Sequence, residues 1–332
     1  MLILAGSLST WLDKNILHHT GFVGRVSLDL TLKELPLHHC IQFWGNKRQQ
    51  FADHEIIKLL CITGGVPRYI EELDFSLSVE QNITRLCLEP SGLLFDEFED
   101  MFSDLFSTYN TLYLAMLRGI AASSSKLTSY ELAKVIGRPQ NGTFSNCIEN
   151  LEKSGFITRD FSWDPKTLKP ARKPKLRISD CYTAFYFRAI DKHKNALNAG
   201  VITLNNLPSL AGLQFENLIL NNRSAVLKRL DIEPGQVLFD NPFYQSARTR
   251  RAGCQIDYLI QTRNNILYLC EIKFHLKAIG TEVVDEMESK IKALQMPKNA
   301  SYRKVLIHVN GVAVAVEDSG YFDQLIGVSE LM

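Results

Sequence analysis

The sequence predicts a mixed α/β protein built from several domains. A chain of 332 residues exceeds the usual size of one domain, and 45% apolar residues supply ample material for hydrophobic cores. Apolar residues recur at helical spacing through most of residues 36–154, whereas short apolar runs bounded by turn residues mark strands in the last third. We therefore expect helical units first and an α/β unit at the C-terminal end.

Composition and cysteine usage narrow the class of protein. The formal net charge is +1, so a role in nucleic-acid binding needs a local basic surface. Seven scattered cysteines without a C-x-x-C pair indicate buried, reduced thiols rather than disulfides or a zinc site. No apolar run approaches the length of a membrane span, and the first residues lack the basic start of a signal peptide. We expect a cytoplasmic protein without a membrane partner.

The first hundred residues contain one strand-like run followed by helices. Residues 2–5 are continuously apolar and end at Gly6, which favours a buried parallel strand. Such a strand needs neighbours, and an exposed one predicts instability, a protein partner or self-association. Residues 36–100 have helical spacing, with turn residues at 64–67 and 90–92.

The middle of the chain predicts three helices and two strands. Residues 111–122 are apolar at helical period, and Thr128 with Glu131 forms a capping-box pattern that opens a short second helix. A third helix covers residues 144–154. Two strands follow around a polar loop, at residues 156–159 and 175–178. This order of elements is typical of a winged-helix domain.

The polar loop between these two strands is basic, and its cations are Lys166, Lys169, Arg172, Lys173 and Lys175. Such a wing can contact phosphates, while Ser145 and Asn146 on the third helix can meet the DNA backbone or bases. The alternative is a solvated loop in a domain used for protein contacts. A nucleic-acid surface and a protein-contact surface both stay open here.

The last third predicts a helix, a hairpin and a further helix and strand. The helix covers residues 214–230, and strands at 255–260 and 266–274 are joined by a turn at 263–265. A second helix covers residues 282–294, and another buried strand covers residues 304–310.

The hairpin carries a candidate metal site. Glu271 and Lys273 are two residues apart on a strand and share a face, and a hairpin can place Asp257 beside Glu271. Two carboxylates and a backbone carbonyl suit Mg²⁺, with Lys273 placed to assist water and to offset charge on a phosphate. Glu216 on the preceding helix can supply a further carboxylate. The alternative is an ordinary cross-strand ion pair, but charges that interrupt an apolar strand need a partner or a metal.

Three segments of the last third resemble the C-terminal domain of archaeal-type ATPases, which looks like a PD-(D/E)xK (restriction-endonuclease-like) nuclease fold. They are residues 214–220, 255–260 and 270–274. The resemblance implies catalytic roles for Glu216, Asp257, Glu271 and Lys273, with Asp257 and Glu271 as the metal ligands.

Shorter segments resemble the nucleotide-sensing parts of the same AAA+/STAND-type family. Residues 2–7 resemble a sensor-1 strand, Gly24-Arg25 stands where an arginine senses nucleotide, and residues 64–69 resemble a turn of the helical lid. The resemblance implies nucleotide-sensing roles for Ser7, Arg25 and Pro67. In order, it implies four parts: a remnant of the P-loop ATPase core (1–35), a helical lid (36–100), a winged helix (101–195) and a nuclease-like domain (205–332).

The chain departs from this family at the nucleotide site. It contains no G-x-x-x-x-G-K-[S/T] loop to hold phosphates. Residues 93–97 imitate the acidic pair of a Walker B strand, but they continue with helical spacing and predict an amphipathic helix. We therefore expect an N-terminally truncated family member that does not hydrolyse ATP on its own, ATP being a cofactor only of a full-length parent.

The leading functional prediction is a DNA-interacting member of this ATPase family with a Mg²⁺-dependent nuclease-like domain. Two alternatives remain. One is a catalytically inactive regulatory module that binds DNA or a protein. The other is the effector half of a nucleotide-driven switch.

Overall fold

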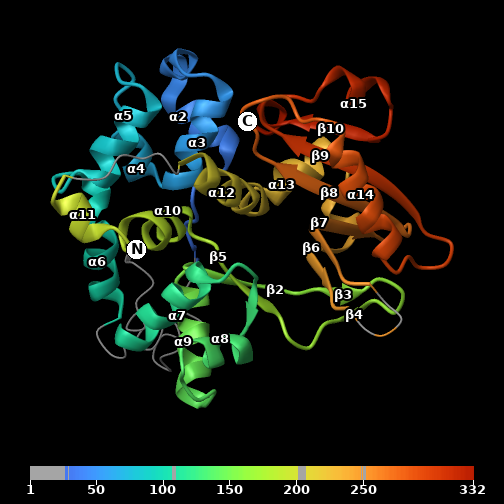
Figure 1. Ribbon diagram of the computed structural model, residues 1–332, viewed down its shortest axis with the longest axis horizontal. Coiled ribbons are helices and arrows are strands. Elements are labelled where there is room, and N and C mark those ends of the chain that lie inside the picture. Colours follow the sequence, from blue (N-terminus) through green and yellow to red (C-terminus); the bar gives the residue numbers. More distant parts are fainter. Residues whose placement is uncertain (1–26, 29, 107–109, 201–206, 248, 250–251) are drawn as a thin grey trace.

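The computed structural model has a mixed α/β fold and describes residues 27–28, 30–106, 110–200, 207–247, 249 and 252–332. Helices of the first two-thirds of the chain gather on one side, and a five-stranded sheet from the last third lies on the other (Figure 1). The predicted α/β class is confirmed. In the described part of the chain, no helix is both long and apolar enough to cross a membrane. All seven cysteines are buried thiols, as predicted.

The first helical part surrounds a buried helix. Its α-helices are α2 (Leu37–Trp44), α3 (Asp53–Thr63), α4 (Pro67–Glu71), α5 (Val79–Ile83) and α6 (Leu93–Leu105), with α10 (Cys181–Phe185) and α11 (Lys194–Asn198) returning later in the chain. Helix α3 is the most enclosed, because seven of its eleven residues are buried. Residues 93–105 form a helix, as predicted, and its Phe98 stacks on Phe102 and Tyr186. This aromatic contact packs α6 against the segment that follows α10.

The middle of the chain contains three helices and short antiparallel strands. These elements are α7 (Asn110–Ala122), β1 (Leu127–Thr128), α8 (Ser129–Val135), α9 (Gly142–Lys153), β2 (Ile157–Asp160), β3 (Trp163–Asp164), β4 (Lys169–Pro170) and β5 (Lys175–Ile178). Strands β1, β5 and β2 form one sheet in that order, and β3 pairs with β4. The capping box is confirmed, since Thr128 Oγ1 accepts a hydrogen bond from Glu131 N.

The last third forms a mixed sheet covered by helices. Its elements are α12 (Leu207–Asn221), α13 (Arg223–Arg229), β6 (Val237–Gln245), β7 (Cys254–Thr262), β8 (Ile266–Lys273), α14 (Glu282–Ala293), β9 (Ser301–His308), α15 (Val314–Asp318) and β10 (Gln324–Gly327). The strand order is β10-β9-β8-β7-β6. The pairs from β6 to β8 are antiparallel, and those from β8 to β10 are parallel.

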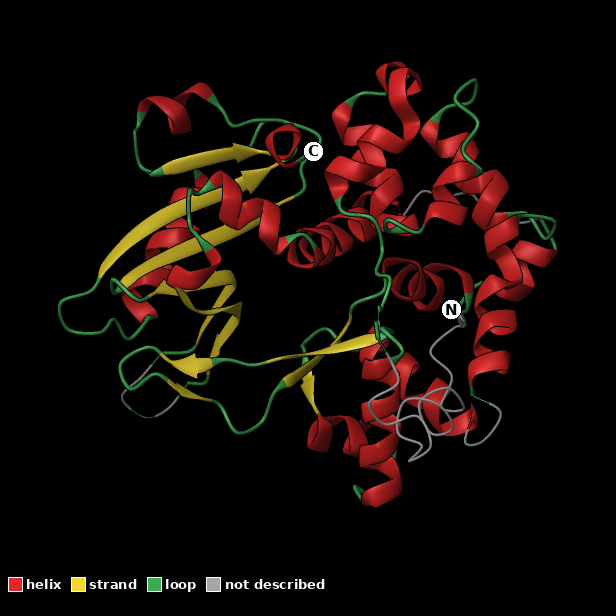
Figure 2. Ribbon diagram, turned by 180° about the vertical axis from the view of Figure 1, so that it is seen from behind, coloured by secondary structure: helices red, strands yellow, loops and turns green. Residues whose placement is uncertain are grey.

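Alternation along β8 divides the interior into two hydrophobic cores. Cys270 and Ile272 belong to the larger core, which contains α12 and continues into the helices of the first part of the chain. Leu267 and Leu269 belong to the smaller core, which contains residues of α14 and α15. Both faces of the sheet are therefore buried, and helices lie on either side of it (Figure 2).

Two features differ from the predicted elements. The single helix predicted for residues 214–230 is broken at Asn222, whose side chain donates to Leu218 O and accepts from Leu37 N. An asparagine that bonds to backbone groups competes with helical hydrogen bonds. Strand β6 was not predicted, since it contains Pro242, which sheets tolerate at edges and bulges. Here β6 is an edge strand with a register shift at that proline.

The β3–β4 hairpin is attached to the edge of the five-stranded sheet. The Trp163 ring stacks on Phe239 at 5.1 Å, and its Nε1–H donates to Gln261 Oε1 at 2.6 Å. Ser162 Oγ accepts from Tyr244 N at 3.2 Å and donates to Tyr244 O at 3.1 Å. A hydroxyl group thereby satisfies backbone groups on the free edge of β6. The base of the loop predicted as a wing is thus packed on the sheet.

Candidate metal site on the β7–β8 hairpin

The hairpin places Asp257 beside Glu271, as the sequence predicts. Strands β7 and β8 pair antiparallel with Tyr258 opposite Cys270, so Asp257 and Glu271 follow as neighbours. The Asp257 Oδ2 atom accepts a hydrogen bond from Ile272 N at 3.0 Å. This bond fixes the carboxylate against the backbone of the neighbouring strand.

A β-bulge at Asp257 alters the direction of this side chain. Asn241 pairs with Leu259 and Phe243 pairs with Ile256, so two residues of β7 stand opposite one residue of β6. The two residues are Asp257 and Tyr258. Bulges are frequent beside functional sites because they re-aim a side chain.

Glu271 is a buried charge held by two lysines. Its side chain is only 2% exposed, and its Oε1 lies 3.1 Å from Lys273 Nζ. Its Oε2 contacts the ammonium group of Lys290 on α14. A carboxylate this deeply buried requires such partners, because an unpaired charge in the interior is strongly destabilising.

Lys273 belongs to an alternating row of charges. Its Nζ also lies 2.7 Å from Glu286 Oε2, and Glu286 and Lys290 share one face of α14 at i and i+4. Burial acts to lower the pKa of Lys273, but the bond to Glu286 and the charge of Glu271 raise it above its ordinary value. Both Lys273 and the carboxylates beside it are therefore charged at neutral pH.

Asp257 is the carboxyl group that these lysines compensate least. Burial, and next the charge of Glu271, raise the pKa of Asp257 to about 7, while Lys290 acts in the opposite direction. The negative potential at Asp257 thus exceeds what the neighbouring ammonium groups offset. A hard divalent cation would relieve it, so the donor set fits Mg²⁺.

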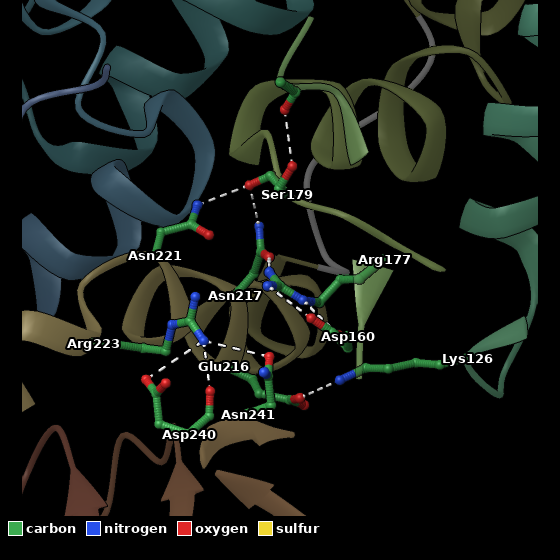
Figure 3. Close-up of polar contacts among 11 residues, drawn as sticks. Lys126, Asp160, Arg177, Ser179, Glu216, Asn217, Asn221, Arg223, Asp240 and Asn241 are labelled. Atoms are coloured by element: carbon green, nitrogen blue, oxygen red, sulfur yellow. Dashed lines mark hydrogen bonds and ion pairs between the residues drawn. The ribbon is translucent and has the colours of Figure 1, made fainter. Parts of the chain in front are cut away.

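Glu216 is placed near this pair without joining it. Its Oε1 lies 2.5 Å from Lys126 Nζ, and its charge is a minor contribution to the raised pKa of Asp257. Figure 3 shows Glu216 on α12 facing Lys126, which precedes β1. Within the described residues, no three His, Cys, Asp or Glu side chains are grouped as one metal ion requires. Asp257 and Glu271 form a pair, and Glu216 stands apart from them.

Polar side chains anchor α12 between the middle strands and the sheet (Figure 3). Asp160 is 2% exposed and pairs with Arg177 Nε at 3.0 Å, and Arg177 also donates to Asn217 Oδ1. At the other end, Arg223 Nη1 donates to Asp240 O at 2.8 Å, a bond to β6. The helix that carries Glu216 is therefore tied to both parts.

The basic residues predicted for nucleic-acid contact lie in and around the β3–β4 hairpin. Lys166, Lys169, Arg172 and Lys173 are exposed. Lys175 is instead paired with Glu131 at 2.9 Å, and Lys173 Nζ lies 5.6 Å from the centre of the Tyr130 ring. Four cations thus remain accessible on a hairpin whose base is fixed by Trp163.

The residues predicted to sense nucleotide are only partly described. Ser7 and Arg25 lie outside the described residues, as does the predicted strand at residues 2–5. Pro67 is the first residue of α4, and Gly64 before it has φ +59°, a conformation that favours glycine. At Gly65 a side chain has no room, because a Cβ atom would lie 1.9 Å from Leu35 O.

Sequence reasoning missed Lys290, Glu286 and Lys126. The first two carried a usable signal, since an acid and a base four residues apart mark one helix face that can meet the charged face of a strand. Lys126 carried none. It is separated from Glu216 by 90 residues, and only the folded chain brings the two together.

No protein-family model matches the chain. It is similar to the uncharacterized protein MJECL04 of Methanocaldococcus jannaschii, at 24% identity over 210 residues. That match covers 61% of this chain and 44% of the relative, less than half of its length. The solved structure of protein VC1899 from Vibrio cholerae aligns at 12% identity over 72% of this chain and 52% of the other, with a TM-score of 0.29, and supports no argument here.

Proposed function

We propose that the β7–β8 hairpin carries a Mg²⁺-dependent phosphodiesterase site that acts on DNA, in a restriction-endonuclease-like C-terminal domain. Asp257 and Glu271 would hold the metal, with the carbonyl of Ile272 as a third oxygen donor. When bound, the metal supplies Lewis acidity toward a phosphate and an activated water. The single observation that carries the proposal is the pairing of Asp257 and Glu271 across the hairpin, with Lys273 against Glu271.

The residues of the chain itself have distinct tasks in this proposal. Lys273 orients the attacking water and offsets negative charge that develops on the phosphate. Lys290 keeps Glu271 ionised in its buried position. The bond from Ile272 N holds Asp257 toward Glu271. Asp257 must lose its proton before it can hold a cation, so activity is expected to rise with pH through about 7.

The middle of the chain would supply the DNA-binding surface as a winged helix. The element order α7, α8, α9, β2, β5 and the exposed cations of the β3–β4 hairpin support this. The attachment of the hairpin through Trp163 would hold bound DNA in a fixed relation to the sheet. Binding should weaken with salt, because each phosphate contact releases counterions.

The proposal is tested by cleavage of plasmid and single-stranded DNA with Mg²⁺ or Mn²⁺. Wild-type protein should cleave only with the metal, and Asp257→Ala and Lys273→Ala should abolish cleavage. The matched control is Lys175→Ala, which removes an ion pair of similar length elsewhere in the protein. Metal-independent cleavage, or cleavage retained by Asp257→Ala, would contradict the proposed site.

A second candidate is a module that binds DNA or protein without cutting. One observation favours it: both oxygens of Glu271 are already bound by ammonium groups. In that case the row of charges serves only to join α14 to β8. DNA retention that is unchanged by EDTA and is not followed by cleavage would support this candidate.

We also propose that the chain belongs to the archaeal-type ATPase family, with the helices of residues 36–100 as its lid. The turn at Gly64–Pro67 supports this assignment, and ATP would act only in a full-length parent. The chain would then be the effector part of a nucleotide-driven protein. The test is the coding sequence upstream of Met1: an in-frame G-x-x-x-x-G-K-[S/T] motif is expected, and its absence would count against the assignment.

A further inference from the structure

The ion pair between Lys126 and Glu216 connects the proposed metal site with the middle of the chain. Lys126 precedes β1, whereas Glu216 lies on α12 next to the five-stranded sheet (Figure 3). Their side chains are 20% and 22% exposed, and 2.5 Å separates the charged atoms. An ion pair that is largely shielded from water interacts more strongly than one on the open surface.

The charge of Glu216 reaches the metal site. After burial and the charges of Glu271 and Lys290, Glu216 also contributes to the raised pKa of Asp257. Lys126 offsets that charge and holds one oxygen of the carboxylate. In this arrangement Glu216 is oriented toward Lys126 and is withheld from a cation bound at Asp257 and Glu271.

Tyr244 supplies a second, independent observation at the same place. Lys126 Nζ lies 5.4 Å from the centre of its ring, and its buried hydroxyl group has no hydrogen-bond partner among the described residues. Burial, then the charges of Asp160 and Glu216, raise the pKa of Tyr244, so the hydroxyl stays protonated as a donor. A buried donor without an acceptor favours any rearrangement that brings one. Glu216 released from Lys126 would be such an acceptor.

We propose that Lys126 is a positioning residue that regulates the metal site by withholding Glu216 from it. A displacement of Lys126 from α12 frees Glu216 to add a third carboxylate beside Asp257 and Glu271. The middle of the chain thereby controls the affinity of the site for its cation. This inference rests on the proposed function, because it concerns the same metal site.

Titration of the full chain with Mn²⁺ in a calorimeter tests the inference by its sign. Lys126→Met removes a positive charge and frees Glu216, so it should tighten Mn²⁺ binding about three- to tenfold. Lys126→Arg keeps the charge and should bind as the wild type does. The gain should vanish in a Glu216→Gln background, and the control Lys175→Met should leave the affinity unchanged. A merely structural lysine predicts the opposite sign, so weaker or unchanged binding by Lys126→Met would overturn the inference.

A wild-type protein that binds no Mn²⁺ would contradict the proposed function, and the inference is then decided by urea unfolding at pH 8. Lys126→Met and Asp257→Asn are combined in a double-mutant cycle. Because Glu216 left unpaired acts on Asp257, the second substitution should stabilise the Lys126→Met protein more than the wild type. The expected coupling is about threefold or more in the unfolding equilibrium constant. Additive effects would overturn the link between the two residues.

Discussion

Two pairs of buried carboxyl groups in this protein are held in opposite ways. Asp257 and Glu271 lie among ammonium groups, with Lys273 and Lys290 both on Glu271. Glu34 and Asp180 share a hydrogen bond that Glu34 donates, and no lysine or arginine is among the groups that act on them. Burial, and then the charge of Asp180, raise the pKa of Glu34 to about 8, and burial raises that of Asp180.

The difference separates a charged site from a protonated joint. The Glu34–Asp180 pair lies where three segments meet, since Glu34 Oε2 accepts from Gly65 N at 3.2 Å and Asp180 caps α10 through Thr183 N. It is stabilised by keeping one proton. The pair on the hairpin is stabilised by lysines, which leaves its carboxylates ready for a cation. A buried acid alone therefore does not mark a metal site.

The largest effect is expected where the compensation of Glu271 is removed. Lys290→Met leaves a buried carboxylate with Lys273 as its remaining ionic partner, and should lower the free energy of unfolding by about 3 kcal/mol. Urea denaturation at pH 7 measures this. Adding Glu271→Gln should restore most of the loss, since no buried charge then remains. Lys153→Met, which removes an exposed pair with Glu149, is the control.

The joint should show itself in the pH dependence of stability. The pKa of Glu34 is higher in the folded than in the unfolded chain, so stability falls as pH rises from about 4.5 to about 8. Glu34→Gln keeps an N–H donor toward Asp180 and removes this titration. At pH 8 it should be about 3 kcal/mol more stable than the wild type, and at pH 4 nearly equal. Identical pH profiles of the two proteins would show that the pair does not share a proton.

Asp257 should show the same sign with a smaller amplitude. Its pKa of about 7 means that stability is lost between about pH 4 and pH 7 as the unfolded chain ionises first. Asp257→Asn should therefore stabilise the protein by about 2 kcal/mol at pH 8, measured by thermal or urea unfolding without metal. Mg²⁺ should raise the stability of the wild type and leave the variant unchanged. A variant less stable than the wild type at pH 8 would place Asp257 among groups that need its charge.

The smallest effect is expected at the exposed end of the row. Glu286 is 48% exposed and pairs with Lys273, so Glu286→Gln should cost only about 0.5 kcal/mol. Lys273 keeps Glu271 as a partner in that variant. Unfolding at low and high salt checks this, since an exposed pair is screened by salt. A loss as large as that of Lys290→Met would mean that the row acts as one network.

The hairpin could be predicted because its signals are local. Alternation places Glu271 and Lys273 on one face, and the turn residues set Asp257 on the adjacent strand. The bulge at Asp257 could not be predicted, because it depends on Pro242 of β6, a strand that sequence reasoning did not recognise. The break at Asn222 was missed for a similar reason. Its partner is Leu37, 185 residues away.

The groups that set the charge of the site were also invisible in the sequence. Lys290 lies 19 residues beyond Glu271, on a helix whose position over the sheet follows from the packing of the smaller core. Lys126 reaches Glu216 only because Arg177, Asn217 and Arg223 fix α12 between two parts of the chain. Local pattern predicts which residues carry charge, and tertiary packing decides which of them are neutralised.

Binding of Mn²⁺ to the wild type and to Asp257→Asn, measured by calorimetry between pH 6 and pH 8, tests the central claim most directly. The account predicts one binding event in the wild type that tightens as pH rises through about 7, because the cation displaces a proton from Asp257. It predicts no such event in Asp257→Asn, while Glu34→Gln binds as the wild type does. Equal binding by Asp257→Asn and the wild type, at any pH in this range, would contradict the metal site at Asp257 and Glu271.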